Sequence, residues 1–220
     1  MRILALSDIH SEQRVLDGLR SRLTRGRYDA IFIAGDTADY NDTLFFDGLI
    51  DLIGKIPLYI IPGNMDDVLV QERIGRLDKC VELEKKRLTS KYEVFGIGGG
   101  LRGPFHTPYE YYDDELGEKI KDVVLEPPSI VLSHCPPYGY FDDVGMDVHI
   151  GSKSVLRLMQ ANRPFMLICG HVHEHRGHIN VDGTNIIKLG PAKNGSAAEI
   201  TFSHGGTAGG KVEVNWIDLF

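Results

Sequence analysis

Cysteine is scarce in this sequence, and its arrangement excludes two kinds of protein. The chain has 3 cysteines, Cys80, Cys135 and Cys169, in 220 residues. No two of them form a Cys-x-x-Cys pair, so neither a framework of disulfides nor a thiolate zinc site is expected. A reducing compartment suits such a chain.

Long apolar runs are also missing. The longest, such as residues 31–34 and 58–61, are far shorter than the roughly 18 residues that a membrane-spanning helix needs. The apolar run after Met1 ends at Ser7 and Asp8, which is too short for a secretory signal. We therefore expect a cytoplasmic protein that does not enter a membrane.

Positive charge is in the minority and is not concentrated anywhere. The sequence has 24 Lys and Arg against 31 Asp and Glu, a formal net charge of -7. Its densest basic cluster, residues 85–87, follows Glu82 and Glu84 closely. Because no basic block is available to neutralise a run of phosphates, extended nucleic-acid binding is not expected.

Short apolar runs alternate with longer amphipathic stretches in the first part of the chain. Apolar runs at 3–6, 31–34 and 58–61 are expected to be strands. The stretches between them place apolar residues at helical spacing: Val15, Leu16, Leu19 and Leu23 in the first, and Leu44, Phe45, Leu49, Leu52 and Ile53 in the second. Two successive β-α-β units predict an α/β protein with a parallel sheet and right-handed crossovers.

The pattern becomes richer in strands and turns after residue 78. Apolar runs at 130–132 and 165–169 flank a further helical stretch. Asp182-Gly183 predicts a two-residue hairpin turn between strands at 178–181 and 184–188. Residues 198–202 are expected to pair with 211–216. With no linker or repeat, we expect one domain over residues 1–220, holding a second, more antiparallel sheet.

Residue types that bind metals follow five of the apolar runs. Ligands of open α/β sheets bind at the carboxyl ends of the strands, so these residues are expected to converge. Their nitrogen and oxygen donors suit Mn, Fe, Ni or Zn better than Ca or Mg alone. Seven donors fit two ions that share a carboxylate. The candidate ligands are Asp8, His10, Asp36, Asn64, His134, His171 and His173.

Two of these segments, Asp8-Ile9-His10 and His171-Val172-His173, hold two candidates each. In an extended segment, alternate side chains point to the same side. We therefore expect both members of each pair to face the site from extended backbone.

The candidates lie in five ordered blocks that resemble a known family. The blocks read Asp8-Ile9-His10, Gly35-Asp36-Thr37-Ala38-Asp39, Gly63-Asn64-Met65-Asp66, Ser133-His134-Cys135-Pro136-Pro137 and Gly170-His171-Val172-His173. Over residues 1 to about 190, the chain resembles the calcineurin-like metallophosphoesterases, and in particular the small predicted phosphoesterases of archaea and bacteria. The resemblance implies a four-layer α-β-β-α sandwich of two mixed sheets.

The resemblance also implies a dinuclear metal site. One ion would be held by Asp8, His10, Asp36 and His173, and the other by Asp36, Asn64, His134 and His171, with Asp36 bridging. Manganese is the first expectation, with nickel, iron and zinc as alternatives.

The activity implied is hydrolysis of a small phosphorylated substrate by a metal-bound hydroxide, with phosphodiesters favoured over phosphomonoesters and a nucleotide-like compound as one option. Paired ions about 3.5 to 4 Å apart clamp phosphoryl oxygens and lower the pKa of bound water from 15.7 towards about 7. A homo-oligomer is left open.

One residue departs from the family pattern. Many members have histidine after Gly-Asn in the third block, where this chain has Met65. Methionine cannot donate a proton to the leaving group. Either another, unassigned group acts as the acid, or the leaving group needs little help, as with an aryl oxide or a phosphoanhydride. The alternative is a catalytically weak metal-binding scaffold or regulatory subunit of the same fold.

Other residues near the blocks receive simpler interpretations. Asp39 is expected to be a turn or helix-start acid. Cys135 is expected to point away from the site and to be buried as a small apolar residue. Some aromatic side chains are hypothesised to rim the pocket and stack on a base or aryl group. They come from two groups: Tyr109, Tyr111 and Tyr112, and Tyr138, Tyr140 and Phe141.

Overall fold

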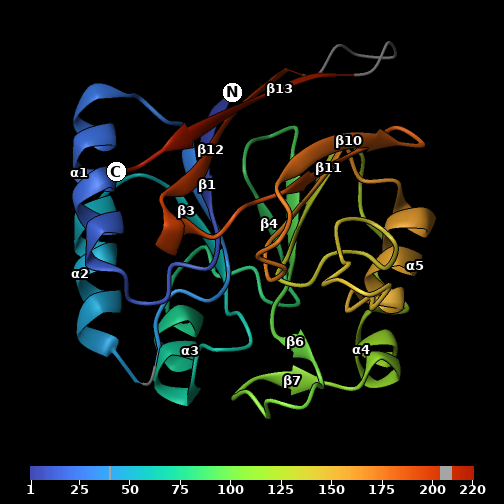
Figure 1. Ribbon diagram of the computed structural model, residues 1–220. Coiled ribbons are helices and arrows are strands. Elements are labelled where there is room, and N and C mark those ends of the chain that lie inside the picture. The colour runs from blue at the N-terminus through green and yellow to red at the C-terminus, as the bar shows by residue number, and fades with distance from the viewer. Residues whose placement is uncertain (40, 204–209) are drawn as a thin grey trace.

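The computed structural model describes residues 1–39, 41–203 and 210–220, and two sheets dominate it (Figure 1). The first sheet has the strand order β13-β12-β1-β2-β3. Strands β1 to β3 run parallel, whereas β12 pairs antiparallel with β1, and β13 with β12. The bounds are β1 (Arg2–Leu6), β2 (Ala30–Ala34), β3 (Leu58–Ile61), β12 (Ser196–Ser203) and β13 (Lys211–Asp218).

The second sheet has the order β10-β11-β9-β8-β5-β4. Its four central strands are parallel, and each edge strand pairs antiparallel with its neighbour. The bounds are β4 (Lys85–Arg87), β5 (Glu93–Ile97), β8 (Ser129–Ser133), β9 (Met166–Cys169), β10 (Gly177–Val181) and β11 (Thr184–Lys188). A short parallel pair, β6 (Gly100–Leu101) and β7 (Glu110–Tyr111), stands apart from both.

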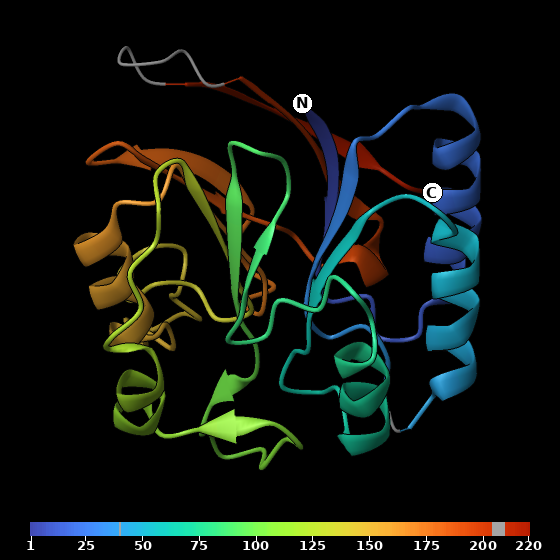
Figure 2. The same ribbon diagram turned by 180° about the vertical axis from the view of Figure 1, so that it is seen from behind.

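Helices cover the outer faces of both sheets. In the view from behind, α1 and α2 cover one outer face and α4 and α5 lie on the opposite side (Figure 2). The bounds are α1 (Gln13–Arg25), α2 (Thr43–Ile53), α3 (Val68–Gly75), α4 (Asp113–Ile120), α5 (Lys153–Asn162) and the 3₁₀ helix η1 (Ala192–Asn194).

The alternation of side chains along the strands produces the layers. In β1, Leu4 and Leu6 pack into the core shared with α1 and α2. Ile3 and Ala5 face the other way, into a core between the two sheets that also holds Leu132 of β8. A third core lies between the second sheet and helices α4 and α5. The expected α-β-β-α sandwich of two mixed sheets is therefore confirmed.

Local sequence chemistry fixes where the helices begin and end. The Asp42 side chain accepts a hydrogen bond from the Phe45 N–H, 3.0 Å away, at the start of α2. That helix ends at Gly54, whose φ of 62° suits glycine. Ser152 caps α5 in the same way through the Val155 N–H.

Most of the strands expected from the sequence are present. The β10–β11 hairpin turns at Asp182-Gly183, with Val181 opposite Thr184, and β12 pairs with β13 as predicted. The glycine-rich turn at 204–209 lies outside the described residues.

The expected second sheet is present, but the prediction that it is the more antiparallel one was wrong. Strands β12 and β13 extend the first sheet, where β12 pairs with the edge of β1 that β2 leaves open. Only β10 and β11 join the second sheet, whose centre is parallel.

The helix predictions were less complete. Leu44, expected on the buried face of α2, is 84% exposed, because the stripe that packs inward is centred on Phe45, Phe46 and Leu49. The eight-residue helices α3 and α4 were not anticipated.

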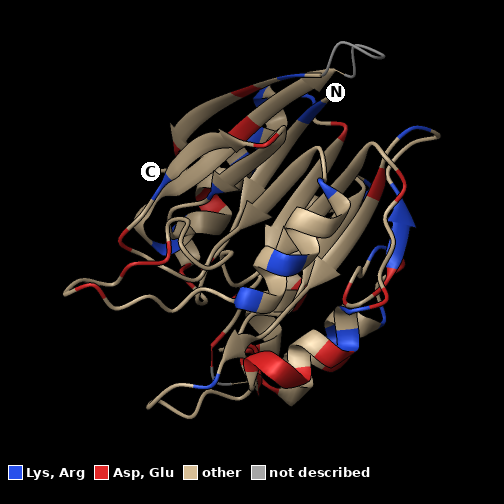
Figure 3. Ribbon diagram, turned by 90° about the vertical axis from the view of Figure 1, so that its right-hand side faces the viewer, with Lys and Arg blue, Asp and Glu red and all other residues tan. Residues whose placement is uncertain are grey.

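The surface mixes charges of both signs. In the side view, Lys and Arg segments are interspersed with Asp and Glu segments (Figure 3). Within the described ranges, no helix has both the length and the apolar character required to cross a bilayer.

Candidate metal centre

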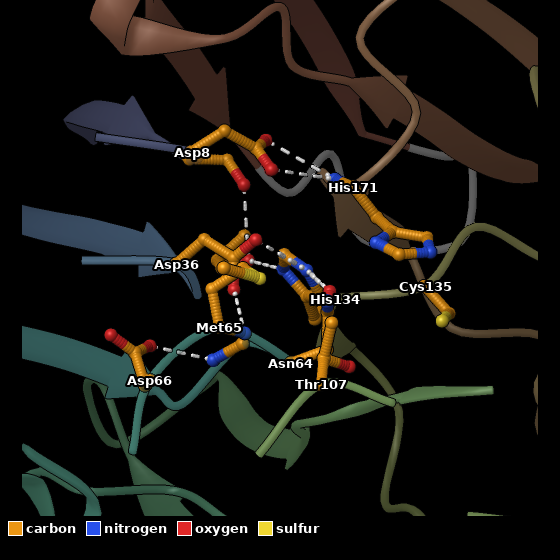
Figure 4. A network of polar contacts seen from close by, with 12 residues as sticks. Asp8, Asp36, Asn64, Met65, Asp66, Thr107, His134, Cys135 and His171 are labelled. Atoms are coloured by element: carbon orange, nitrogen blue, oxygen red, sulfur yellow. Dashed lines mark hydrogen bonds and ion pairs between the residues drawn. The ribbon is translucent and has the colours of Figure 1, made fainter. Parts of the chain in front are cut away.

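The structure brings all seven candidate ligands to one place. They follow the carboxyl ends of β1, β2, β3, β8 and β9, and the close-up shows five of them, with those from β1, β2 and β8 facing a common space (Figure 4). Asn64 Oδ1 lies 2.9 Å from His134 Nε2. The rings of His134 and His171 are 4.9 Å apart between centroids, and those of His10 and His173 are 5.6 Å apart.

Two carboxylates occupy the middle of this cluster. Asp36 Oδ2 lies 3.6 Å from His10 Nε2 and 3.4 Å from His134 Nε2. Asp8 accepts hydrogen bonds from the His171 N–H and lies 3.3 Å from His173 Nε2. Two sets have ligand atoms within 4.8 Å of one another: Asp8, His10 and His173, and Asp8, Asp36 and His134. These sets could each hold a metal ion.

Left-handed backbone places several of these side chains. Asp8, His10, Asp36 and His171 have φ values of 56°, 51°, 52° and 72°. Asp and His tolerate this region better than most residues. The expectation that Asp8-Ile9-His10 and His171-Val172-His173 present their ligands from extended backbone was therefore wrong. The chain turns sharply at the strand ends instead, and the turns aim side chains from neighbouring strands at the same space.

Two glycines allow the strand ends to approach closely. A Cβ atom on Gly63 would lie 2.1 Å from Asp36 Oδ1, and one on Gly35, where φ is 90°, would lie 2.5 Å from His134 Nδ1. Any larger residue at these positions would push the candidate ligands apart.

Hydrogen bonds orient two of the imidazoles. His10 Nδ1 lies 2.8 Å from Asp39 Oδ1, and His134 Nδ1 lies 2.7 Å from the Ala34 carbonyl oxygen. Both oxygens only accept, so each Nδ1 carries the proton and each Nε2 faces the cluster. Asp39 therefore orients His10 and is more than the turn acid that the sequence suggested.

One buried nitrogen fits a cation. His10 Nε2 is buried without a hydrogen-bond partner and faces Asp36 across 3.6 Å. A lone pair opposite a carboxylate is unfavourable unless positive charge lies between them, as a second ring proton or a metal ion. The mixture of carboxylate, amide and imidazole donors fits a borderline transition metal.

The charges of the site are strongly coupled. Burial alone would raise the pKa of Asp8 and of Asp36, but contacts with His173 and His134 bring both below their usual values. Burial opposes a charged His134, yet Asp36 raises its pKa to about 9. Burial and the neighbouring His134 lower the pKa of His171 to about 4. Without metal, the site therefore holds ionised carboxylates balanced by imidazolium.

Asp66 has a role that the sequence did not reveal. Its carboxylate accepts hydrogen bonds from the N–H groups of Thr37 (2.9 Å), Ala38 (3.0 Å) and Gly63 (2.7 Å). It thereby joins the segment after Asp36 to the segment that carries Asn64. Burial and the nearby Asp36 raise the pKa of Asp66 to about 7. In the sequence, the only indication of this role was the position of Asp66 directly after Asn64-Met65.

Lys188 is a second residue that the sequence analysis missed. It is fully buried at the end of β11, and its Nζ donates to the carbonyl oxygens of Leu189 (2.5 Å) and His175 (3.4 Å). Burial lowers its pKa, an effect that Asp8 opposes. In the sequence, the only indication of this role was a lysine at the end of an apolar run.

A cavity of about 670 Å³ opens over the cluster. Its walls include five candidate ligands (His10, Asp36, Asn64, His171 and His173), with Asp39, Met65, Lys193 and residues 105–108. Asp8 and His134 lie beneath, with no exposed surface.

The aromatic residue on the cavity wall is not one of those hypothesised. The two groups of tyrosines and Phe141 are not among the described residues that line the cavity, and Phe105 is. Tyr109 donates instead to the half-buried Glu82, and Tyr112 stacks against Arg102. Cys135 behaves as expected: it is buried, it points away from Asp36 (Figure 4), and burial raises its pKa to about 12.

Asp66 provides a test of how the centre is positioned. We expect Asp66→Asn to weaken Mn²⁺ binding about 10- to 100-fold, because an amide cannot accept all three N–H groups and the two segments separate. Titration calorimetry would measure the affinity. Asp67→Asn, at the start of α3, is the matched control and should keep it. An unchanged affinity in Asp66→Asn would show that the three hydrogen bonds to Asp66 do not position the candidate ligands.

The comparisons with known proteins agree with this geometry. An uncharacterized protein of Methanocaldococcus jannaschii is 27% identical over 199 residues, which cover 87% of this chain and 88% of that protein. The protein TT1561 of Thermus thermophilus superposes with a TM-score of 0.70 at 17% identity, covering 100% of this chain and 99% of that one. A dimetal phosphatase from Danio rerio gives a TM-score of 0.60 at 11% identity, covering 100% and 99%. At these identities, the two structures show the fold.

The family itself is shown by a sequence model. The model described as calcineurin-like phosphoesterase matches residues 1–175, a range that contains the seven candidate ligands. The proteins that this model describes are metal-dependent hydrolases of phosphate esters. Since the match spans most of the chain and the two-sheet fold agrees with it, the chain belongs to the calcineurin-like phosphoesterase family.

Proposed function

We propose that this protein hydrolyses phosphodiester bonds of small or nucleotide-like substrates, using two divalent metal ions that share Asp36. The observation that carries the proposal is the position of Asp36 Oδ2, 3.6 Å from His10 Nε2 and 3.4 Å from His134 Nε2. A carboxylate between two imidazole nitrogens suits a bridge between two cations.

We assign the candidate ligands to two groups, one for each ion, and Asp36 belongs to both. Asp8, His10 and His173 would join it around one ion, and Asn64, His134 and His171 around the other. One compact donor set, Asp8, His10 and His173, supports the first group, and the other, Asp8, Asp36 and His134, supports the central position of Asp36 between the groups. Manganese is our first choice because it accepts both carboxylate and imidazole ligands, and nickel, iron and zinc remain alternatives.

The bound ions and several residues of the chain would have separate roles in the reaction. Two bound ions would polarise the phosphoryl oxygens and lower the pKa of water towards about 7. Asp39 and the Ala34 carbonyl hold the rings of His10 and His134 in the tautomer that presents Nε2. Lys193, on the cavity wall, adds a positive charge for an anionic substrate. Met65 offers no proton, so esters with good leaving groups, such as aryl oxides, suit the site best.

Hydrolysis of bis(p-nitrophenyl) phosphate with added Mn²⁺ tests the proposal. We expect turnover by the wild type with about two ions per chain. Asp36→Asn should lower kcat/KM at least about 100-fold, because the amide removes the charge that both ions share. Asp47→Asn, which alters a surface carboxylate beside Arg73, is the control and should leave the rate unchanged.

Two outcomes would count against this function. No turnover with Mn, Ni, Fe or Zn at full occupancy would reject phosphodiester hydrolysis. Metal binding together with such inactivity would favour the scaffold or regulatory role, for which Met65 in place of histidine is the motivating observation.

The pH dependence of metal binding follows from His134. Its pKa of about 9 in the metal-free protein means that an ion bound at Nε2 must displace a proton below that pH. The pKa of His10 is raised as well: burial opposes its charged form, but Asp39 and Asp36 outweigh that effect. Mn²⁺ affinity should therefore rise at least about tenfold per unit between pH 6 and 8.

Calorimetry in two buffers of different ionisation enthalpy would count the released protons at pH 7. His178→Ala, a histidine that bonds to Asn185 outside the cluster, should keep the wild-type dependence. A pH-independent affinity would contradict the assignment of His134 as a ligand.

A further inference from the structure

An exposed aromatic side chain stands over the metal centre. Phe105, in the loop between β6 and β7, is 87% exposed. Single exposed apolar residues are common on protein surfaces and need no explanation. The position of Phe105 is what distinguishes it, because the ring borders two separate hollows that both open onto the candidate metal ligands.

The two hollows meet at the metal centre and differ in their far walls. Both are lined by Asn64, His171, Phe105 and Thr107, and the close-up shows Thr107 beside Asn64 (Figure 4). The larger, of about 670 Å³, continues towards Lys193. The smaller, of about 320 Å³, continues past Leu101, Pro104 and Ile150, and its wall also includes Arg102, Glu110 and His149. Phe105 therefore lies between two hollows of unequal size, and of the two only the larger is lined by Asp36 and Lys193.

The loop that carries Phe105 is tied to the metal centre. The Tyr109 N–H donates to the Asn64 carbonyl oxygen, 3.1 Å away. The Thr107 N–H and hydroxyl both donate to Glu110 Oε1, each at 2.7 Å. Pro104 and Pro108 restrict the backbone on either side of the aromatic residue. A loop held in this way loses little backbone entropy when a ligand packs against it.

We infer that the site takes phosphodiesters whose two substituents lie on opposite sides of Phe105, and that the substituent retained after hydrolysis is an aryl group or nucleobase stacked on this ring. This inference rests on the proposed function. A phosphodiester has two organic groups on one phosphorus, so a phosphoryl group at the shared walls sends one group into each hollow. The smaller hollow, where Leu101, Pro104 and Ile150 lie beside Phe105, suits a flat retained group, and the larger hollow towards Lys193 suits the leaving group.

A pair of substrates with the same leaving group isolates the effect of the retained group. We propose to compare phenyl p-nitrophenyl phosphate with methyl p-nitrophenyl phosphate in the Mn²⁺-loaded protein. The ratio of their kcat/KM values should fall about tenfold in Phe105→Ala, because a stacking contact is lost for the phenyl ester alone. Differences in intrinsic reactivity cancel when the ratio is compared between wild type and variant.

Two further variants complete the test. Phe105→Tyr keeps a flat ring and should keep the wild-type ratio. Leu44→Ala removes an apolar side chain of similar exposure, 84%, from helix α2, and should leave the ratio unchanged. Each variant should bind as many Mn²⁺ ions as the wild type, because none of the substitutions touches a candidate ligand.

The failures of the two proposals can be told apart. Turnover of both esters with an unchanged ratio in Phe105→Ala would overturn the role of Phe105 and leave phosphodiester hydrolysis standing. Absence of turnover of both esters by the wild type with Mn²⁺, Ni²⁺, Fe²⁺ or Zn²⁺ would overturn phosphodiester hydrolysis, and with it the stacking inference.

Discussion

The burial of two carboxylates side by side constrains the whole centre. Asp8 and Asp36 are 0% and 3% exposed, and each repels the ionised form of the other. Two negative charges in such a place are unstable unless cations neutralise them. The imidazole nitrogens that face these carboxylates provide either protons or ligand atoms. A metal ion could therefore replace protons at this site, as the proposed metal-dependent hydrolysis requires.

The surrounding backbone holds this arrangement in place. Left-handed turns at Asp8 and Asp36 aim their side chains inward, and Gly63 leaves room for Asp36 to approach. Asp66 then ties the segments after β2 and β3 together through three backbone N–H groups. Several of these groups are conformationally strained or buried and polar, so their cost must be offset by the packed sandwich on either side. Turns, glycines and hydrogen bonds of the chain itself therefore position the candidate ligands.

Features of the structure that depend on local sequence pattern were correctly predicted from the sequence. Strand ends bearing Asp36 or His134 could be located because apolar runs and the residues after them are neighbours in the chain. The hydrogen bonds that Asp66 accepts from Thr37, Ala38 and Gly63 could not be predicted, since the direction of a side chain depends on packing with distant segments. The same limit hid the exposure of Leu44 and the place of Phe105, a residue in a loop with no periodic signal. The resemblance supplied the packing of two mixed sheets between helices, which periodicity leaves open.

The central claim is that two ions share Asp36. Anomalous diffraction from crystals grown with Mn²⁺ tests it most directly, because manganese can be located independently of the protein atoms. The account predicts two anomalous peaks about 3.5 to 4 Å apart, with the carboxylate of Asp36 in contact with both. A single peak, or two peaks bound by residues outside this cluster, would contradict it.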